Sequence, residues 1–424
     1  MKTSVYRWGT AGILASLLLL TAGCGAKETD SKFQPKLDTK ANVELNILGF
    51  FGNFEALDQV SNDFNQYYPN VTFDYQQVGG AKTEAYLDAN EGVDIFMTSS
   101  LSLTLPGGTL PERCIDLNEA GVDTSAIDDD MLKLYNMGGR QISFPMAQHL
   151  TGMVVNRSLL EKEDLTVPTD TEEFLSVLAA LKKKGYTPIQ GPSSKVYAEL
   201  TRGYAFAELC SNEAVLSAAK AGGEEAVDAI KPAFDFLDTI LREGYTDPAI
   251  NDTYPDDNYD GAILKFFEGD VPFWVCDTEK VSGMKKRESK SEAFQQNAFD
   301  YGFVFAPVGE AAGWLYQEPW YGFAANKGGD DRDYAIEFLR FLATTEEINK
   351  IADVKGVPSP AKENTVPAVY QAVLSQDLDS RRCTNTGAIT ADMESGWYSC
   401  TTDYVNGTYD SAESAIRAFL TSVH

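Results

Sequence analysis

The sequence predicts an α/β fold with two lobes, each built on a mainly parallel sheet flanked by helices. Residues 43–48 alternate apolar and polar side chains as a strand does, and residues 55–68 carry apolar side chains at helical spacing. Residues 71–75 and 93–97 again have strand character. Strands that alternate with helices at this spacing favour parallel pairing. The 424 residues exceed what one core ordinarily organises, so two lobes are expected.

The rest of the chain keeps this mixed character. Further helices are predicted over residues 172–184, 196–210, 224–243, 331–343 and 411–421. Further strands are predicted over residues 271–275, 301–305 and 321–325.

The first 24 residues predict export. Lys2 and Arg7 precede an apolar run from Ala11 to Leu20, and small residues then lead to Cys24. A basic start, a short apolar core and small residues before a cut mark an export signal. The run is shorter than the roughly 20 apolar residues of a membrane-spanning helix. Its end resembles a bacterial lipobox, which implies a signal peptide over residues 1–23 and a lipid on Cys24. An ordinary cleaved signal is the alternative.

The mature chain is strongly acidic. The formal charge is -28, and removal of residues 1–23, which hold two basic and no acidic residues, leaves -30. Such a charge repels nucleic acid phosphates and anionic headgroups, so no nucleic acid partner is expected. Residues 24–40 are polar and charged, which predicts a flexible tether after the lipid.

The cysteines indicate neither a disulfide framework nor a metal site. If Cys24 carries lipid, an odd number remains, namely Cys114, Cys210, Cys276, Cys383 and Cys400. No C-x-x-C occurs, and no metal or other cofactor is expected. A Cys383–Cys400 bridge is conceivable in an exported chain, but free and mostly buried thiols are the favoured interpretation.

Four stretches, taken in order, resemble the extracellular solute-binding proteins of bacterial ABC importers, of the maltose-binding-protein-like carbohydrate type. The first joins the strand at Val43 to Phe64-Asn-Gln-Tyr-Tyr-Pro-Asn-Val and Val93-Asp-Ile-Phe. The second is Gly139-Arg-Gln-Ile-Ser-Phe-Pro with Gly152-Met-Val-Val-Asn-Arg and Pro168-Thr-Asp-Thr-Glu-Glu-Phe. The others are Phe267-Glu-Gly-Asp-Val-Pro-Phe and the run from Gly322 through Asn326-Lys327 to Gly356-Val-Pro-Ser.

The resemblance implies a type II periplasmic-binding-protein fold with ligand in a cleft between the lobes. Chain crossings are expected near residues 145–150, 305–307 and 326–329. The expected N-lobe comprises residues 41–146 plus 307–326, and the C-lobe residues 147–306 plus 327–424. A monomer is expected.

Sugar rings present apolar C–H faces and a rim of hydroxyls, so a sugar site needs flat aromatic rings and planar polar groups. The resemblance places Trp397 and Tyr398 in the cleft, together with Tyr197, and Trp320 and Tyr321 precede an expected crossing. Packing in the core is the alternative for each aromatic side chain.

The other candidates lie where strands end, which is where open α/β sheets bind ligands. They are Phe51 and Asn53 after the first strand, Ser99 and Ser100 after the third, Gln148 and His149 in the first crossing, and Trp274 and Asp277 on a later strand. For His149, a structural role in the hinge is the alternative to a ligand contact.

The leading functional hypothesis is a lipid-anchored binding protein at the outer face of the cell membrane. It captures a sugar or oligosaccharide by lobe closure and delivers it to an ABC permease. Alternatives are a binder of another small solute such as a peptide or polyamine, an exported carbohydrate-active hydrolase, and an adhesin or sensory partner. No enzyme is expected, because His149 is the one internal histidine and no G-x-S-x-G occurs.

Overall fold

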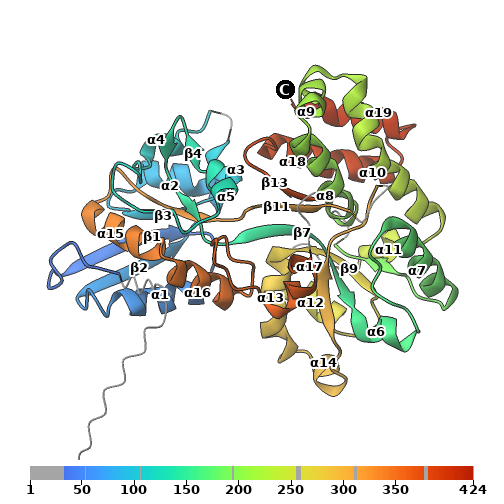
Figure 1. Ribbon diagram of the computed structural model, residues 1–424, viewed down its shortest axis with the longest axis horizontal. Helices are drawn as coiled ribbons and strands as arrows, with labels where there is room; N and C mark the ends of the chain where they lie inside the picture. The colour runs from blue at the N-terminus through green and yellow to red at the C-terminus, as the bar shows by residue number, and fades with distance from the viewer. Residues whose placement is uncertain are drawn as a thin grey trace, which may run out of the picture. The chain divides into compact units, whose positions relative to one another are not determined.

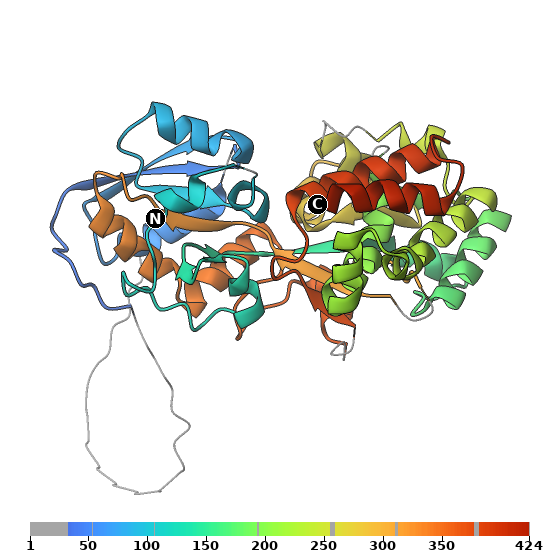
Figure 2. The same ribbon diagram turned by 90° about the horizontal axis from the view of Figure 1, so that it is seen from above.

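The computed structural model describes residues 33–423 except Asn53, Pro106 and residues 193–194, 255–258, 310–312 and 377–380. The predicted export signal and Cys24 therefore lie outside the described residues. Helices and two larger sheets make up the described chain (Figure 1), and Figure 2 shows the same elements from above. Within this part, no helix combines the length and apolar character needed to cross a membrane.

The first sheet has the strand order β2-β1-β3-β12-β6 and, with its helices, forms what we call the first lobe. The strands are β1 (Val43–Gly49), β2 (Val71–Gln77), β3 (Ile95–Thr98), β6 (Phe144–Pro145) and β12 (Gly322–Ala325). Three helices pack together beside this sheet (Figure 1), namely α1 (Glu55–Phe64), α15 (Arg332–Leu342) and α16 (Thr345–Lys355), and α15 contacts β1 and β12 directly. Leu57, Val60 and Phe64 recur at helical spacing on α1 and are all buried, which fixes the face that α1 turns inward.

The second sheet has the order β13-β11-β7-β9-β8, with β10 also paired to β7, and forms the second lobe. Its strands are β7 (Gln148–Asn156), β8 (Ile189–Gln190), β9 (Phe273–Asp277), β10 (Tyr301–Val304), β11 (Leu315–Pro319) and β13 (Arg382–Thr384). The long strand β7 runs antiparallel to β9, β10 and β11. In the first sheet β12 also runs antiparallel to both of its neighbours. The α/β class is therefore confirmed, but the expectation of mainly parallel sheets was wrong, because the chain returns between the lobes on strands of opposite direction.

The second lobe holds most of the remaining helices. A group of four, α8, α10, α18 and α19, packs together beside β11 and β13 (Figure 1). The helices of this lobe are α6 (Arg157–Lys162), α7 (Thr171–Lys183), α8 (Val196–Ser211), α9 (Glu213–Ala221), α10 (Glu224–Arg242), α11 (Pro248–Asn251), α12 (Tyr259–Phe266), α13 (Thr278–Glu288), α14 (Glu292–Gln296), α17 (Ala368–Leu374), α18 (Ala391–Val405) and α19 (Ala412–Leu420). The short elements of the first lobe are α2 (Thr83–Ala89), α3 (Ser100–Leu103), α4 (Leu110–Arg113), α5 (Asp129–Lys133), β4 (Asn136–Met137) and β5 (Arg140–Gln141).

Three chain segments connect the lobes, and they are hydrogen-bonded to one another. Met146 and Ala147 join β6 to β7, and Trp320 and Tyr321 join β11 to β12. These two segments run side by side, because the Trp320 amide donates to the Ala147 carbonyl at 3.0 Å and the Met146 amide donates to that of Tyr321 at 2.8 Å. The third segment, residues 356–367, leads from α16 to α17, and its Pro358 carbonyl accepts from the Gln148 amide at 2.9 Å.

The close approach of two crossing strands requires a glycine. A Cβ atom at Gly322 would lie 2.2 Å from the carbonyl oxygen of Phe144 on β6. Only glycine therefore allows β12 to pair with β6 here without a shift of the backbone.

The expected lobe boundaries need correction. Residues 315–319 form β11 of the second sheet, although 307–326 was assigned to the N-lobe. Helices α15 and α16 pack on the first lobe, although 327–424 was assigned to the C-lobe. The first crossing falls inside the expected 145–150, whereas the other two lie at Trp320–Tyr321 and 356–367. Local patterns identify strands and helices, but they do not reveal which sheet a strand joins.

The described end of the predicted tether is attached to the first lobe. The Lys36 amide donates to Glu337 Oε1 at 2.8 Å, and the Leu37 amide donates to the Tyr68 hydroxyl at 3.2 Å. The Tyr334 hydroxyl donates to the Asp38 carbonyl at 2.9 Å. Because these side chains supply partners for the backbone, a flexible tether cannot extend to residue 40. The five cysteines from Cys114 onward are free thiols.

Candidate functional site

A buried charged cluster lies in the second lobe and is centred on Arg202 of α8. The Arg202 guanidinium donates to Thr151 Oγ1 on β7 at 2.8 Å and to Glu394 on α18 at 3.3 Å. Its Nη2 atom lies 3.6 Å from Glu318 on β11, and its Nε atom lies 3.6 Å from Glu199. Helix α8 is buried on almost all sides, and residues 199 and 202, one turn apart, lie on the same side of it and pair with each other inside the lobe.

His149 connects this cluster to the start of β7. Its Nδ1 atom lies 3.3 Å from Glu318 Oε1 and 3.2 Å from Arg202 Nη2, and its Nε2 atom lies 3.8 Å from Asp277 Oδ2. Burial by itself disfavours the charged ring, but the two carboxylates outweigh it and raise the pKa of His149 to about 10. The same contacts lower the pKa of Asp277 against the effect of its own burial. The two carboxylates therefore favour the protonated ring, whereas the neighbouring Arg202 guanidinium opposes it.

The cluster carries more negative than positive groups. Its carboxylates are those of Glu199, Asp277, Glu318 and Glu394, and its cations are His149, Arg202 and Lys280. Burial and the neighbouring Glu318 carboxylate raise the pKa of Glu394 to about 7. Glu394, whose side chain is 25% exposed, is thus the most accessible carboxylate that contacts Arg202. It can accept from solute hydroxyls when ionised and donate one hydrogen bond when protonated.

Four aromatic rings gather at the crossing, and we call them the aromatic wall: Phe51, Phe54, Trp320 and Tyr321. Phe51 meets Trp320 and Tyr321 edge to face, with ring centroids 5.7 and 5.1 Å apart. Phe54 lies tilted against Phe51 at 5.2 Å. Phe51 and Trp320 are half-buried, whereas Phe54 and Tyr321 are buried beneath them. The wall therefore offers parts of two rings to a solute.

The aromatic wall and the charged cluster adjoin at His149. The ring centroid of His149 lies 6.1 Å from that of Trp320, and Trp320 follows directly on the strand that carries Glu318. Flat apolar rings thus lie beside carboxylate, imidazolium and tyrosine groups. Apolar C–H faces and hydroxyls, as a sugar presents them, can be accommodated by such a combination.

The structure brings six of the predicted site residues to this region. Phe51, His149, Asp277 and Trp320 stand there as described, and Tyr321 lies there too, buried beneath the wall. The hydroxyl of Tyr398 accepts from Arg202 Nη1 at 3.2 Å and donates to Glu199.

Four predicted aromatic contacts are corrected. Trp397, Trp274 and Tyr321 have no exposed surface, and Tyr197 is 5% exposed. Trp274 packs between Phe266 and Tyr254, and Trp397 packs against rings of three helices. These side chains fill the core, so the core-packing alternative holds for them in this conformation.

Two polar candidates have local structural partners. Gln148 is buried and donates through Nε2 to the Ser359 carbonyl at 2.7 Å, which ties two crossings together. Ser99 exchanges hydrogen bonds with Ser102 at the start of α3. Asn53 lies outside the described residues, as does the side chain of Ser100.

The charged residues of α8, β11 and α18 were not predicted. Arg202 and Glu199 lie in a helix whose other side chains are mostly apolar or small. These two charges were the available signal in the sequence, because an arginine buried in such a helix requires anionic partners. Nothing local links them to Glu318 and Glu394, which join them only through the tertiary fold.

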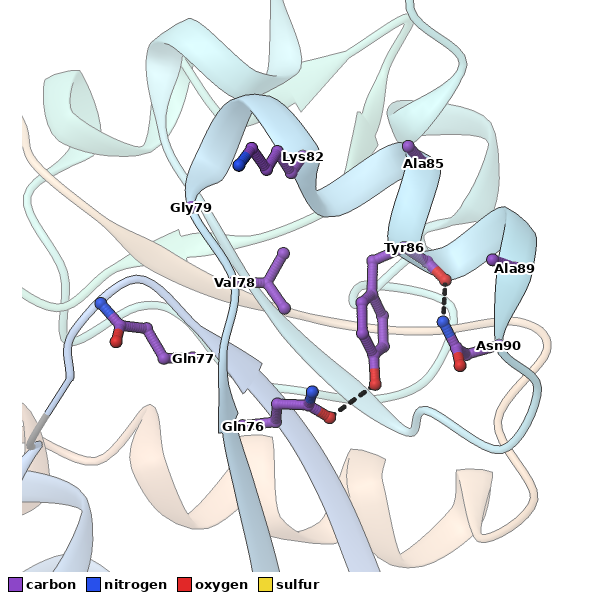
Figure 3. A pocket seen from close by; sticks show the side chains of 9 residues that line it. All are labelled: Gln76, Gln77, Val78, Gly79, Lys82, Ala85, Tyr86, Ala89 and Asn90. Atoms are coloured by element: carbon purple, nitrogen blue, oxygen red, sulfur yellow. Dashed lines mark hydrogen bonds between the residues drawn. The ribbon is translucent and has the colours of Figure 1, made fainter.

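A separate surface depression of about 530 Å³ lies between the end of β2 and α2 (Figure 3). Figure 3 shows the Tyr86 ring beside Gln76, whose side-chain oxygen accepts from the Tyr86 hydroxyl at 2.5 Å. Its lining residues all come from positions 76–90, so it shares none with the charged cluster or the aromatic wall.

Comparison with known proteins identifies one family. A family model described as bacterial extracellular solute-binding protein matches residues 59–373. No curated protein sequence is significantly similar to the chain.

Solved structures share the fold at low sequence identity. A sugar transporter protein of Bacillus licheniformis, solved with stachyose, is 16% identical with a TM-score of 0.65, over 89% of this chain and 98% of that one. The apo form of RafE from Streptococcus pneumoniae is 16% identical with a TM-score of 0.68, over 92% and 100%. The sugar-binding protein MalE from Xanthomonas citri is 16% identical with a TM-score of 0.68, over 90% and 96%.

Proposed function

The chain belongs to the family of bacterial extracellular solute-binding proteins, and from this premise we propose that it captures a sugar or oligosaccharide for an ABC importer. The observation that carries the proposal is the aromatic wall beside the charged cluster, where the half-buried Trp320 lies next to His149. Proteins of the same fold were solved with stachyose and with raffinose, and another is described as a chitin oligosaccharide binding protein. Those solutes define the first panel to test.

Capture works by lobe closure in this proposal. Phe51 belongs to the first lobe and Glu394 to the second, while Trp320 lies in a crossing between them. A solute that touches all three binds most tightly when the lobes close, so it shifts the balance between open and closed forms. The permease then recognises the closed form.

Trp320→Ala is expected to weaken sugar binding about five- to thirtyfold, because an aromatic ring on a bound solute contributes on the order of 1–2 kcal/mol. Isothermal titration against raffinose, stachyose and oligosaccharides of chitin and xylan measures the change. The matched control is Trp314→Ala, which removes a half-buried tryptophan outside the aromatic wall and should leave the affinity unchanged. Heat from a peptide or polyamine, with none from any sugar, would assign the site to that other solute class.

Catalysis is tested on the same samples. We expect each oligosaccharide to be recovered intact after prolonged incubation with the protein, as judged by mass spectrometry. Release of shorter sugars would establish the hydrolase alternative.

The family acts outside the cytoplasm, and we propose that a lipid on Cys24 holds this chain at the outer face of the cell membrane. The mass of the N-terminal peptide, purified from membranes of the native host, is expected to show a diacylated cysteine at position 24. Recovery of the protein in the medium with an unmodified N-terminus would remove the anchor and leave the binding proposal intact.

A further inference from the structure

The face of Phe51 on the aromatic wall is covered by an ammonium group of the same chain. Lys355 is the last residue of α16, and its Nζ atom lies 3.9 Å from the centre of the Phe51 ring. The same atom lies 5.8 Å from the ring centres of Phe54 and Trp320. An ammonium group at these distances is attracted by the negative faces of the rings.

Three neighbouring aromatic rings also pack against Phe51. Trp320 and Tyr321 pack against it edge to face, and Phe54 lies tilted beside it. A sugar ring that stacks on Phe51 would place its carbon atoms about 3.5–4 Å from the aromatic plane. That is the space that the Lys355 ammonium fills, so ring and ammonium exclude each other.

Within the described part of the chain, Lys355 forms no close ion pair with a carboxylate. Burial lowers the pKa of Lys355 to about 8, and Glu279 on α13 and Glu55 on α1 oppose this shift. Both carboxylates have cations of their own, Lys280 and Lys286. Lys286 and Arg287 of α13 are the cations that act on Lys355. Departure of the ammonium from the wall therefore breaks no close ion pair to either glutamate.

We propose that Lys355 is a built-in competitor for the aromatic wall: its ammonium must leave the face of Phe51 before a sugar ring can stack there. The inference rests on the proposed sugar-binding function. It makes Lys355 a specificity determinant. The positive charge repels cationic solutes from the wall. A neutral solute stacks on Phe51 only if that stacking is more favourable than the contact between the ammonium and the ring. When Lys355 loses its proton, its attraction to the ring weakens, so a solute displaces it more easily.

Two substitutions separate competition from ordinary contact. Lys355→Ala removes the competitor and is expected to bind the best sugar of the panel at least about threefold more tightly at pH 7. Lys355→Arg keeps a cation on the rings at every accessible pH and should show no gain. Lys362→Ala is the control for loss of one positive charge, because Lys362 is exposed and pairs with Asp129 at 2.9 Å.

The pH dependence provides a second readout. Wild-type affinity should rise between pH 7 and pH 9 as Lys355 becomes neutral, and the component of this rise with a midpoint near pH 8 should vanish in Lys355→Arg and Lys355→Ala. Without sugar, the tryptophan emission of the wild type should change with a midpoint near pH 8, and that change should be absent in both variants. The variants also separate this effect from titration of His149 and Glu394, which both retain.

The outcomes are distinct. Sugar binding by the wild type with equal or weaker binding by Lys355→Ala overturns the competition and makes Lys355 at most a solute contact. An emission change that persists in Lys355→Arg overturns the contact of its amine with the wall. An absence of sugar binding in every variant overturns the proposed function itself, and the competition with it, whatever the emission shows.

Discussion

Arg202→Met is expected to lower the free energy of unfolding by about 3–5 kcal/mol, because it leaves several buried carboxylates without their common cation. The guanidinium is surrounded by Glu199, Glu318 and Glu394, and the side chains of the first two are 6% and 8% exposed. Methionine fills much of the same volume, so the change in charge dominates over the change in packing. Urea unfolding at pH 7.5 measures the difference, with an unchanged dependence on urea concentration as the sign of a comparable unfolded state.

The control for this prediction carries the same substitution on the surface. Arg417 pairs with Glu224 and Glu413, and its side chain is 39% exposed. Arg417→Met should therefore cost much less stability than Arg202→Met, because solvent screens exposed ion pairs. An Arg202→Met protein as stable as the wild type would show that the carboxylates do not depend on the guanidinium and that water or protons replace it without loss.

The free energy of unfolding should depend on pH, and the raised pKa of Glu394 determines the direction of that dependence. Its pKa is raised from 4.5 in the unfolded chain to about 7 in the folded protein. A carboxyl group with a raised pKa contributes stability that is present below pH 4.5 and is lost as the pH rises to about 7. Arg202 lowers the pKa of Glu394, so loss of this cation in Arg202→Met raises the pKa of Glu394 further. The difference between wild type and variant should therefore grow from pH 5 to pH 8.

The sequence allowed prediction of those features that have a local cause. Alternation in residues 43–48 corresponds to β1, and helical spacing in residues 55–68 corresponds to α1, which ends four residues earlier, at Phe64. The sequence around a strand does not determine which sheet that strand joins. Residues 315–319 and the helices of residues 332–355 were therefore assigned to the wrong lobe. The aromatic side chains show the same limit, since Trp320 and Trp397 have similar local signals. The fold leaves the Trp320 ring half-buried at a crossing and encloses Trp397 completely.

The site shows this limit again in charged residues. His149 and Asp277 were predicted as site residues because His149 stands at an expected crossing and Asp277 stands near the end of a strand. Arg202 gave a weaker signal, namely a charge in a mostly apolar helix, and its partners come from three other segments of the chain. Long-range pairing of this kind is invisible to spacing, which reports on neighbours along one element. The family resemblance did not indicate it either.

Trp397→Ala is expected to cost about 3–5 kcal/mol of stability, the range for removal of a large buried aromatic side chain. The ring centroid of Trp397 lies 5.5 Å from that of Phe234 on α10 and 5.1 Å from that of Phe419 on α19. The indole nitrogen donates to the Ala198 carbonyl on α8 at 3.3 Å. One side chain thus joins α18 to three other helices, and its removal leaves a cavity among all of them. Thermal and urea unfolding measure the loss.

Trp397→Phe distinguishes packing from ligand contact at the same position. Phenylalanine keeps an aromatic ring but loses the indole hydrogen bond and part of the volume, so stability should fall less than in Trp397→Ala. Sugar affinity should stay within about twofold of the wild type, because the ring has no exposed surface. A tenfold loss of affinity in Trp397→Phe, at unchanged helix content, would instead mean that lobe movement exposes this ring to the solute. In that case the packing of α18 against α8 and α19 would have to open on binding. The free-energy cost of that opening would weaken sugar binding.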